Sequence, residues 1–293
     1  MADRDTFGHY RDRMAALGFR PSSTLGQNFL LDPSLHRWIA DQAAPTAADT
    51  VVEIGTGLGF LTRELAARAG RTLGVELDPR LLELAQADLA GMRGLDWLAG
   101  DALGGPGRTL HPGIAAALLA APPAAGGRRL VVANLPYSVS GPLLAELVAA
   151  APLLDTAVVL VQKELAQRIA ARPGGADYGG LSVVVQAVGT AALLRDVPPD
   201  VFRPRPKVVS AILRLDRRRG PLDGADEPAR RQFLAFVRAL FGQRRKALRT
   251  TLPAAAAAIG GSTAALGAID WQLRAEAIAP DTIVGWWRAC RPA

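Results

Sequence analysis

The chain has 293 residues, more than the roughly 100–200 of a common domain, so we expect one large domain and a small appendage. Hydrophobic residues make up 49%, but Ala dominates the richest stretches and Pro or Gly interrupts them, so no run reaches the about 18 large apolar residues of a membrane span. The single Cys excludes an internal disulfide. One Cys and three His also leave too few ligands for a usual zinc site, so we expect no metal. The first 20 residues lack the apolar centre of a secretory signal, which predicts a cytoplasmic protein without a membrane contact.

The net charge of +7 is concentrated at the end of the chain. Residues 217–293 hold 13 Lys and Arg against 6 Asp and Glu, whereas residues 1–216 hold 21 of each kind. A basic block of this kind is typical of a surface that binds phosphates. It is equally typical of an Arg-rich solvated surface, and charge alone leaves both interpretations open.

Short β-branched or apolar runs alternate with helical patterns along most of the chain. The predicted strands are residues 50–54, 72–76, 95–98, 130–133, 156–161, 182–189 and 209–215. Helical spacing in 62–69, 79–89 and 141–150 separates the first five, which predicts a parallel sheet with helices on both faces. The proline-rich loop 198–207 is unsuited to a crossover helix, so we expect the last two strands to form an antiparallel pair at the sheet's edge.

Two segments lie outside this alternation. Residues 104–127 are rich in Ala, Gly and Pro and are predicted to be a surface excursion with one short helix at 114–121, in which we see no function. After the last strand the chain shows no further strand pattern. We therefore place a domain boundary near Arg217 and expect a small all-α domain over 217–293.

The first predicted strand runs into Gly55-Thr56-Gly57-Leu58-Gly59 and then a helix, which is how nucleotide-binding α/β folds begin. Glycines let the backbone turn tightly and approach a ligand closely, although three glycines are often only a tight connection. The dinucleotide fingerprint places its third glycine where this chain has Phe60. A nicotinamide enzyme is thereby disfavoured.

Acidic residues follow the next two strands. Glu76 ends the second strand, where a carboxylate can accept hydrogen bonds from ribose hydroxyls, and Asp101 follows the third, where it can accept from an adenine amino group. Either acid alone is as readily explained as a strand terminator or a helix cap. Three successive loops with suitable groups at the ligand-binding edge of the sheet favour a nucleoside site.

The fourth strand delivers Asn134-Leu135-Pro136-Tyr137 to the same edge. Adenine's exocyclic nitrogen is a poor nucleophile because its lone pair is delocalised into the ring. An Asn side-chain oxygen and a main-chain carbonyl can accept its two hydrogens and aim the lone pair at an electrophilic methyl group, while Tyr137 stacks on the base. The alternative is an ordinary β-turn, in which Asn and Pro are common.

Through these residues the chain resembles the ribosomal RNA adenine N6-dimethyltransferases along most of its length. The matching segments are Leu25–Leu30, Glu53–Gly59, Glu76–Asp78, Gly100–Asp101, Asn134–Tyr137, Tyr178–Ser182 and Phe202–Ala211. Segments Leu25–Leu30, Phe202–Val208 and Arg244–Arg249 resemble the bacterial branch that dimethylates two adjacent adenines near the 3′ end of small-subunit rRNA. The chain departs from the family at Ser138-Val139-Ser140, where Asn-Ile-Ser is usual, and in the 104–127 excursion.

The resemblance implies a Rossmann-like class I methyltransferase fold, with a seven-stranded, mostly parallel sheet whose last strand is antiparallel. It implies S-adenosylmethionine as methyl donor and small-subunit rRNA, within an immature 30S particle, as substrate. The implied catalytic residues are Asn134, Leu135, Pro136, Tyr137 and Phe202, with the two aromatic rings sandwiching the target base. The implied donor-binding residues are Gln27, Asn28, Leu30, Glu53, Gly55, Gly57, Gly59, Glu76, Leu77, Asp101, Ala102 and Asn134.

RNA binding is expected from Arg203, Lys207 and a basic helix over 243–249 that carries Arg244, Arg245, Lys246 and Arg249. Phe202 has the alternative of a core residue in its loop. Two other functions remain open: a DNA adenine methyltransferase, for which 217–293 is short, and a non-enzymatic assembly or transcription factor, against which the intact Asn134–Tyr137 segment argues. We expect a monomer.

Overall fold

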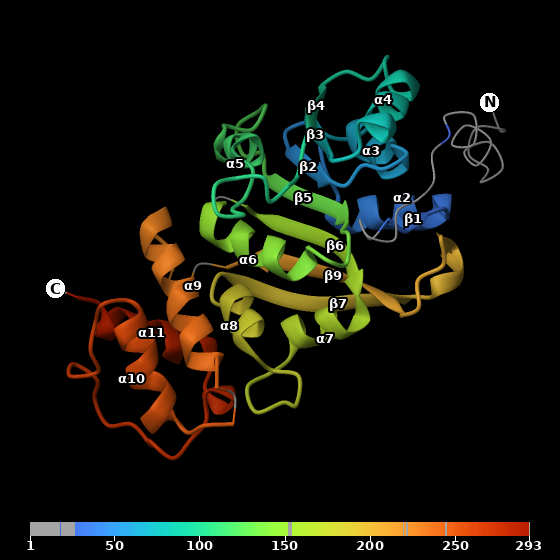
Figure 1. Ribbon diagram of the computed structural model, residues 1–293. Helices are drawn as coiled ribbons and strands as arrows, with labels where there is room; N and C mark the ends of the chain where they lie inside the picture. Colours follow the sequence, from blue (N-terminus) through green and yellow to red (C-terminus); the bar gives the residue numbers. More distant parts are fainter. Residues whose placement is uncertain are drawn as a thin grey trace. The chain divides into compact units, whose positions relative to one another are not determined.

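The computed structural model describes residue 18 and residues 27–151, 154–218, 220, 222–243 and 245–292 (Figure 1). Its strands are β1 Phe29–Leu30, β2 Thr50–Ile54, β3 Arg71–Glu76, β4 Leu95–Ala99, β5 Arg129–Asn134, β6 Thr156–Gln162, β7 Gly189–Val197, β8 Phe202–Arg203 and β9 Ser210–Arg217. Its helices are α2 Pro33–Ala43, α3 Phe60–Ala66, α4 Pro79–Asp88, α5 Pro112–Leu119, α6 Ser140–Ala150, α7 Lys163–Ala170, α8 Gly180–Gln186, α9 Glu227–Phe241, α10 Leu248–Ala258 and α11 Pro280–Cys290. Short 3-10 turns lie at η1 Pro199–Val201 and η2 Ala275–Ala277.

A seven-stranded sheet in the order β4-β3-β2-β5-β6-β9-β7 organises the fold, and β1 pairs with β8 in a separate antiparallel ribbon. Neighbouring strands from β4 to β6 run parallel. Strand β9 runs antiparallel to them: the N–H of Lys163, the residue after β6, donates to the carbonyl of Val209, the residue before β9, at 3.0 Å. The predicted mostly parallel sheet with an antiparallel last strand is confirmed.

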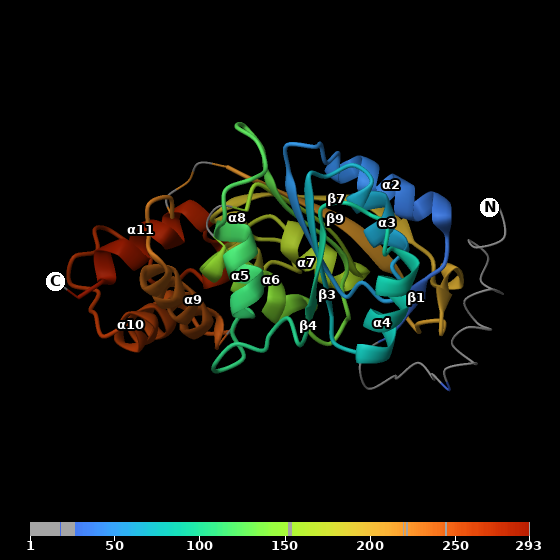
Figure 2. The same cartoon turned by 90° about the horizontal axis from the view of Figure 1, so that it is seen from above.

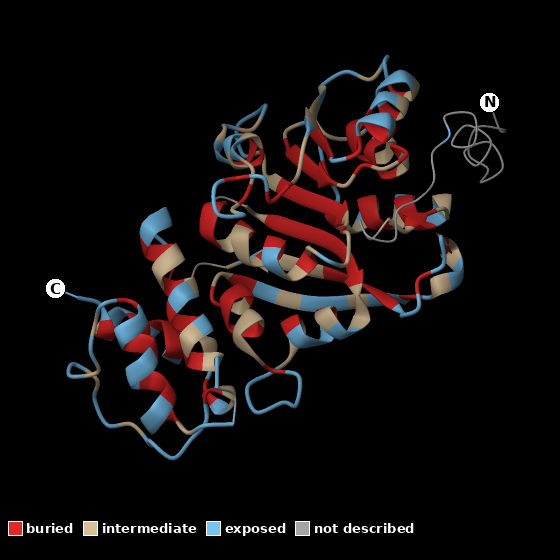
Figure 3. Cartoon of the chain, viewed as in Figure 1, coloured by how far each residue is buried: buried red, intermediate tan, exposed pale blue. Residues whose placement is uncertain are grey.

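The central strands are apolar because a parallel strand covered on both faces needs apolar side chains at nearly every position. All five residues of β2 and six of the seven in β6 are buried (Figure 3). Figure 2 shows α2, α3 and α4 on one side of the strands and α5 on the other. Strands β3 and β4 lie to one side of β2, and β5 and β6 lie to the other. The order of the strands therefore reverses direction between β2 and β5, and such a reversal leaves a crevice at the carboxyl ends of these strands.

The turn after β3 shows how local sequence positions this edge. The Asp78 side chain accepts a hydrogen bond from the Arg80 N–H at 3.0 Å and so caps α4, whose first residue is Pro79. Aspartate at the N-cap and proline at the first helical position are both favoured there. Because Glu76 stands two residues earlier, the same turn that begins α4 fixes Glu76 at the end of β3.

The predicted strand over 182–189 is wrong, since residues Gly180–Gln186 form helix α8 and the strand β7 begins at Gly189. The valines of this stretch favour a strand by propensity. Packing and capping override that preference: Val183 and Val184 are buried together in a hydrophobic cluster, and the Ser182 hydroxyl accepts the Gly179 N–H at 3.0 Å.

The predicted basic helix over 243–249 is also wrong. Helix α9 ends at Phe241, and α10 begins at Leu248, so most of the basic stretch lies in the connection between them. Leu240 and Leu248 are both fully buried in one cluster. The connection lets α10 pack against α9, and both leucines are buried in the cluster that these two helices share.

The chain forms two compact units. The first comprises residues 1–143, 153–163 and 193–215, and the second comprises 144–152, 164–192 and 216–293. The core of the second unit gathers around Trp287, Phe233 and Phe236, all at most 1% exposed. A domain boundary at Arg217 stays a prediction. Of the helices in the described ranges, none is both long enough and apolar enough to span a bilayer.

Candidate active site

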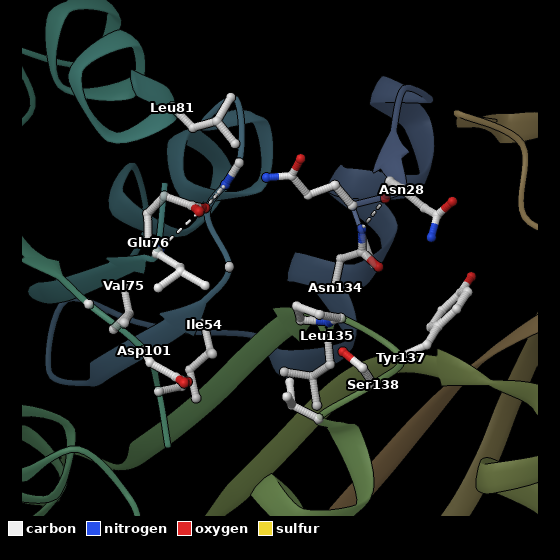
Figure 4. A pocket seen from close by; sticks show the side chains of 18 of the residues that line it. Asn28, Ile54, Val75, Glu76, Leu81, Asp101, Asn134, Leu135, Tyr137 and Ser138 are labelled. Atoms are coloured by element: carbon white, nitrogen blue, oxygen red, sulfur yellow. Dashed lines mark hydrogen bonds between the residues drawn. The ribbon is translucent and has the colours of Figure 1, made fainter. Parts of the chain in front are cut away.

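A cavity of about 300 Å³ opens at the carboxyl ends of the strands in the first unit (Figure 4). It is lined by Gln27, Asn28, Phe29, Ile54, Gly55, Gly57, Val75, Glu76, Leu77, Leu81, Gly100, Asp101, Ala102, Arg108, Asn134, Leu135, Pro136, Tyr137, Ser138 and Val139. The lining therefore brings together the four loops that the sequence singles out, after β2, β3, β4 and β5.

The glycine-rich turn after β2 needs its glycines for shape. Gly55, Gly57 and Gly59 have φ of 80°, 54° and 78°, in the left-handed region that side chains disfavour. A Cβ on Gly57 would also stand 3.3 Å from the ring of Phe29, tighter than ordinary contact. The turn thus brings main chain, without side chains, up to the cavity, and the Gly57 N–H donates to Glu76 at 2.8 Å.

Glu76 is 7% exposed and is held by the backbone. One carboxylate oxygen accepts the N–H groups of Leu77 and Asp78, each at 2.9 Å, and the other accepts that of Gly57. Burial raises the pKa of Glu76, and these three N–H donors act against that rise. Because an ionised carboxylate offers about four acceptor positions, acceptor capacity remains toward the cavity.

Asp101 and its neighbours form the next part of the wall. The Asp101 side chain accepts the Leu103 N–H at 2.9 Å through one oxygen, which fixes the carboxylate in its turn. Leu77, 49% exposed, and Ala102 provide apolar surface beside it. Two carboxylates flanked by apolar side chains suit a flat, polar-edged group such as a nucleoside.

Asn134, at the end of β5, is oriented by a segment far away in sequence. Its side-chain Nδ2 donates to the main-chain carbonyl of Asn28 at 3.1 Å. A carbonyl only accepts, so the amide oxygen of Asn134 must be the end turned away from Asn28. The sequence predicts an acceptor at this position, and the contact to Asn28 is what sets its direction.

Tyr137 completes this side of the cavity. Its hydroxyl lies 2.5 Å from the Ser210 hydroxyl at the start of β9, and burial raises its pKa. Figure 4 shows Asn134 and Tyr137 to the right of the cavity and Glu76 and Asp101 to the left. The Pro136 carbonyl accepts the Ser140 hydroxyl at 2.8 Å, which ties the turn to the beginning of α6.

Four residues implied by the resemblance do not line the cavity. Leu30 and Phe202, 3% and 0% exposed, pack in the hydrophobic core where β1 pairs with β8. Phe202 can stack on a base only if its loop moves. Gly59 faces α4, and Glu53 is buried within β2. The roles expected for these four stay predictions.

Glu53 has an unusual environment for a carboxyl group. It is 1% exposed, and no hydrogen-bond partner for its Oε2 occurs within the described residues. Burial raises the pKa of Glu53 well above its ordinary 4.5, and the charge of Glu76 adds to the rise. The folded state therefore holds this proton more tightly than the unfolded chain does.

A Glu53→Gln variant should be more stable than the wild type at neutral pH. Because the pKa of Glu53 is raised in the folded state, its protonated form contributes to stability. This contribution is complete below pH 4.5, the ordinary pKa of a glutamate, and is lost as the pH rises through the raised pKa of the folded state. Gln carries no proton to lose, so the difference in Tm between variant and wild type should grow from pH 4 to pH 8. Parallel Tm curves would contradict this, and Glu83→Gln, on the exposed face of α4, is the matched control.

The predicted RNA-binding residues are exposed where the structure describes them. Arg203 and Lys207 belong to the first unit, and Arg245, Lys246 and Arg249 belong to the second. Arg244 lies outside the described residues. Several lining residues were not assigned to the site from the sequence, among them Phe29, Leu81 and Arg108. Phe29 stands within the matching segment Leu25–Leu30, whereas nothing in the local sequence marks Arg108.

The described residues contain no group of His, Cys, Asp and Glu side chains placed to hold a metal ion. Their fold is that of Rossmann-like methyltransferases. The structure is similar to a dimethyladenosine transferase from Plasmodium falciparum, with a TM-score of 0.65 at 20% identity over 87% of this chain and 94% of that one. It is also similar to the 23S rRNA methyltransferase ErmE, with a TM-score of 0.58 at 27% identity over 90% and 99% of the two chains.

The family model for ribosomal RNA adenine dimethylase matches residues 18–259. Relatives named ribosomal RNA small subunit methyltransferase A include one from Moorella thermoacetica, 41% identical over 80% of each chain. Another, from Desulfitobacterium hafniense strain DSM 10664, is 37% identical over 93% of each chain. The chain therefore belongs to the ribosomal RNA adenine dimethylase family, which confirms the resemblance and the enzyme class predicted from the sequence.

Proposed function

We propose that the chain transfers methyl groups from S-adenosylmethionine to N6 of two adjacent adenines in small-subunit rRNA, within an immature 30S particle. The family supports an rRNA adenine dimethylase, and the relatives' names support the small subunit. The observation that carries the proposal is that Asn134 and Tyr137 line one cavity with Glu76 and Asp101.

The residues of the cavity fit the proposed donor. Glu76 would accept from the ribose hydroxyls with its remaining acceptor capacity, and Asp101 would accept from the donor's adenine amino group. The side-chain-free turn at Gly55 and Gly57 leaves room for close approach of the main chain. When bound, the sulfonium supplies an electrophilic methyl group.

The turn after β5 would hold the target adenine. The Asn134 side-chain oxygen and the Leu135 carbonyl accept the two hydrogens of the exocyclic amine, favour a pyramidal nitrogen and direct its lone pair. Tyr137 offers a stacking surface for a base removed from its helix. Its hydroxyl is held by Ser210, which fixes the ring's position. The work is positioning and electrostatics, so a strong general base is unnecessary.

Incubation with labelled donor, in parallel with naked DNA and with small subunits from cells that lack the enzyme, tests this proposal. We expect label in the rRNA of the subunits and none in DNA. Asn134→Ala serves as the inactive control in both incubations. Label confined to DNA would contradict the proposal in favour of a DNA adenine methyltransferase, and donor and RNA binding without any transfer would favour a non-enzymatic factor.

We infer that the basic connection between α9 and α10 binds RNA phosphates. Replacing Arg244, Arg245 and Lys246 together by Gln should weaken association with the small subunit and flatten its salt dependence. Each lost phosphate contact lowers the slope of log K against log salt by about 0.7–0.9. Binding titrations at several salt concentrations measure this slope. The control is a triple Gln variant of Arg37, Arg93 and Arg172, which are all exposed and whose loss changes the net charge equally. Equal slopes in the two triple variants would show that the connection does not bind RNA.

A further inference from the structure

Figure 1 shows the loop between β4 and α5, and one residue of this loop places a cation at the cavity. Arg108 lines the cavity and is exposed, and it is the single Lys or Arg among the described lining residues. Within the described part of the chain, its guanidinium has no hydrogen bond or ion pair. The other charged residues of the lining are the carboxylates Glu76 and Asp101.

Arg108 stands on a tight hairpin. The Gly105 N–H donates to the Thr109 carbonyl, and the Arg108 N–H donates to the Gly105 carbonyl, both at 3.0 Å. A Cβ on Gly105 would lie 2.7 Å from the main-chain carbonyl oxygen of Leu110 and 2.3 Å from the Thr109 hydroxyl, so the hairpin requires glycine there. Arg108 itself has φ of 62°, a left-handed conformation that costs free energy for a residue with a side chain.

The base of this hairpin is joined to the loop that carries Asp101. The Gly104 N–H donates to the Asp101 carbonyl at 2.9 Å, and the His111 N–H donates to the Ala102 carbonyl at 2.8 Å. The hairpin and the Asp101 turn thus form one hydrogen-bonded assembly. These backbone contacts set the position of the Arg108 main chain relative to the Asp101 turn.

The geometry points to an RNA backbone phosphate as the group that Arg108 binds, an inference that rests on the proposed function. A donor held as proposed, with its adenine at Asp101 and its methyl group at Asn134, would have its carboxylate beyond the sulfonium, away from the Asp101 turn to which the Arg108 hairpin is joined. It would then bring no anion to the hairpin. An RNA strand that inserts its adenine toward Tyr137 would bring phosphates near the mouth of the cavity, and the exposed guanidinium of Arg108 is suited to bind one.

The charge of the cavity supports the same assignment. Without Arg108, the described lining would carry two carboxylates and no cation, and this field would repel an approaching polyanion. Arg108, which is exposed, offsets one of these charges. Its contribution is to positioning the RNA rather than to base recognition.

Arg108→Gln removes the charge and keeps most of the side chain's length. We expect the KM for small subunits to rise several-fold. The slope of log KM against log salt should fall by about the amount that one phosphate contact contributes. The Kd for S-adenosylhomocysteine, measured by calorimetry, should equal that of the wild type. Arg108→Lys should recover most of the affinity, because a lysine also binds phosphate as a point charge.

Arg93→Gln is the matched control, because Arg93 is an exposed arginine of the same unit that does not line the cavity. A wild-type KM in Arg108→Gln would overturn the inference. So would a weaker Kd for S-adenosylhomocysteine with an unchanged KM for subunits, since the guanidinium would then cover the donor. If the wild type itself fails to methylate subunits, the proposed function fails first, independently of Arg108.

Discussion

Replacing Asn134 by Ala should reduce the rate of methyl transfer on the order of 1,000-fold, while the Kd for the donor changes much less. Ala removes the side-chain oxygen that accepts a hydrogen of the target amine. Loss of one preorganised polar group at a reacting centre typically costs about 100- to 1,000-fold in kcat. Single-turnover methylation of small subunits measures the rate, and calorimetry with S-adenosylhomocysteine measures donor binding.

The structure adds a second consequence of this substitution. Asn134 also donates to the Asn28 carbonyl, so Ala frees one contact between β5 and the segment before β1. A modest loss of donor affinity follows if that segment contacts the donor. Gln162→Ala is the control, because Gln162 ends the neighbouring strand β6 and does not line the cavity. Wild-type turnover in Asn134→Ala would contradict the mechanism.

Replacing Glu76 by Ala should weaken donor binding about 10- to 100-fold, with a smaller effect on the rate at saturating donor. The carboxylate is the proposed partner of the ribose hydroxyls, and hydrogen bonds to a charged group contribute about 1.5–3 kcal/mol each. Calorimetry with S-adenosylhomocysteine gives the Kd. If the variant and the wild type have the same Kd, Glu76 does not bind the donor.

Glu76→Ala should also lower the Tm of the ligand-free protein. Three backbone N–H groups, those of Gly57, Leu77 and Asp78, lose their acceptor, and such loss is costly at a buried position. The increase in Tm on adding S-adenosylhomocysteine should shrink along with the affinity. Glu83→Ala, an exposed carboxylate on α4, controls for the change in net charge.

The sheet and the cavity loops could be predicted because their signals are local. The predicted strand at 50–54 coincides with β2, and its β-branched run leads directly into glycines that have positive φ. The acids after β3 and β4 and the turn after β5 are at the carboxyl ends of parallel strands, which necessarily meet at one edge. These positions follow from sequence order and chain direction alone.

Alternation within strands explains two of the residues that do not line the cavity. Successive side chains of a strand point to opposite sides. Ile54 lines the cavity, so Glu53 before it points into the core; Phe29 lines the cavity, so Leu30 after it is buried. Membership of a motif does not tell which of two neighbouring residues lines the cavity.

Contacts between distant segments account for what the sequence did not reveal. Phe202 is buried because β8 pairs with β1, a partner some 170 residues earlier, and no local pattern predicts that pairing. The valines of α8 favour a strand until the burial of Val183 and Val184 is known. Arg108 lines the cavity from a hairpin that backbone hydrogen bonds join to the Asp101 turn.

Mass mapping of ribosomal RNA from cells with and without the protein tests the central claim most directly. We predict that the small-subunit rRNA of cells lacking the protein contains two adjacent adenines, each lighter by two methyl groups than in the parent. Restoring the wild-type chain, but not Asn134→Ala, should return both masses. Identical small-subunit fragments in the two cell lines, or a loss confined to large-subunit rRNA, would contradict the account.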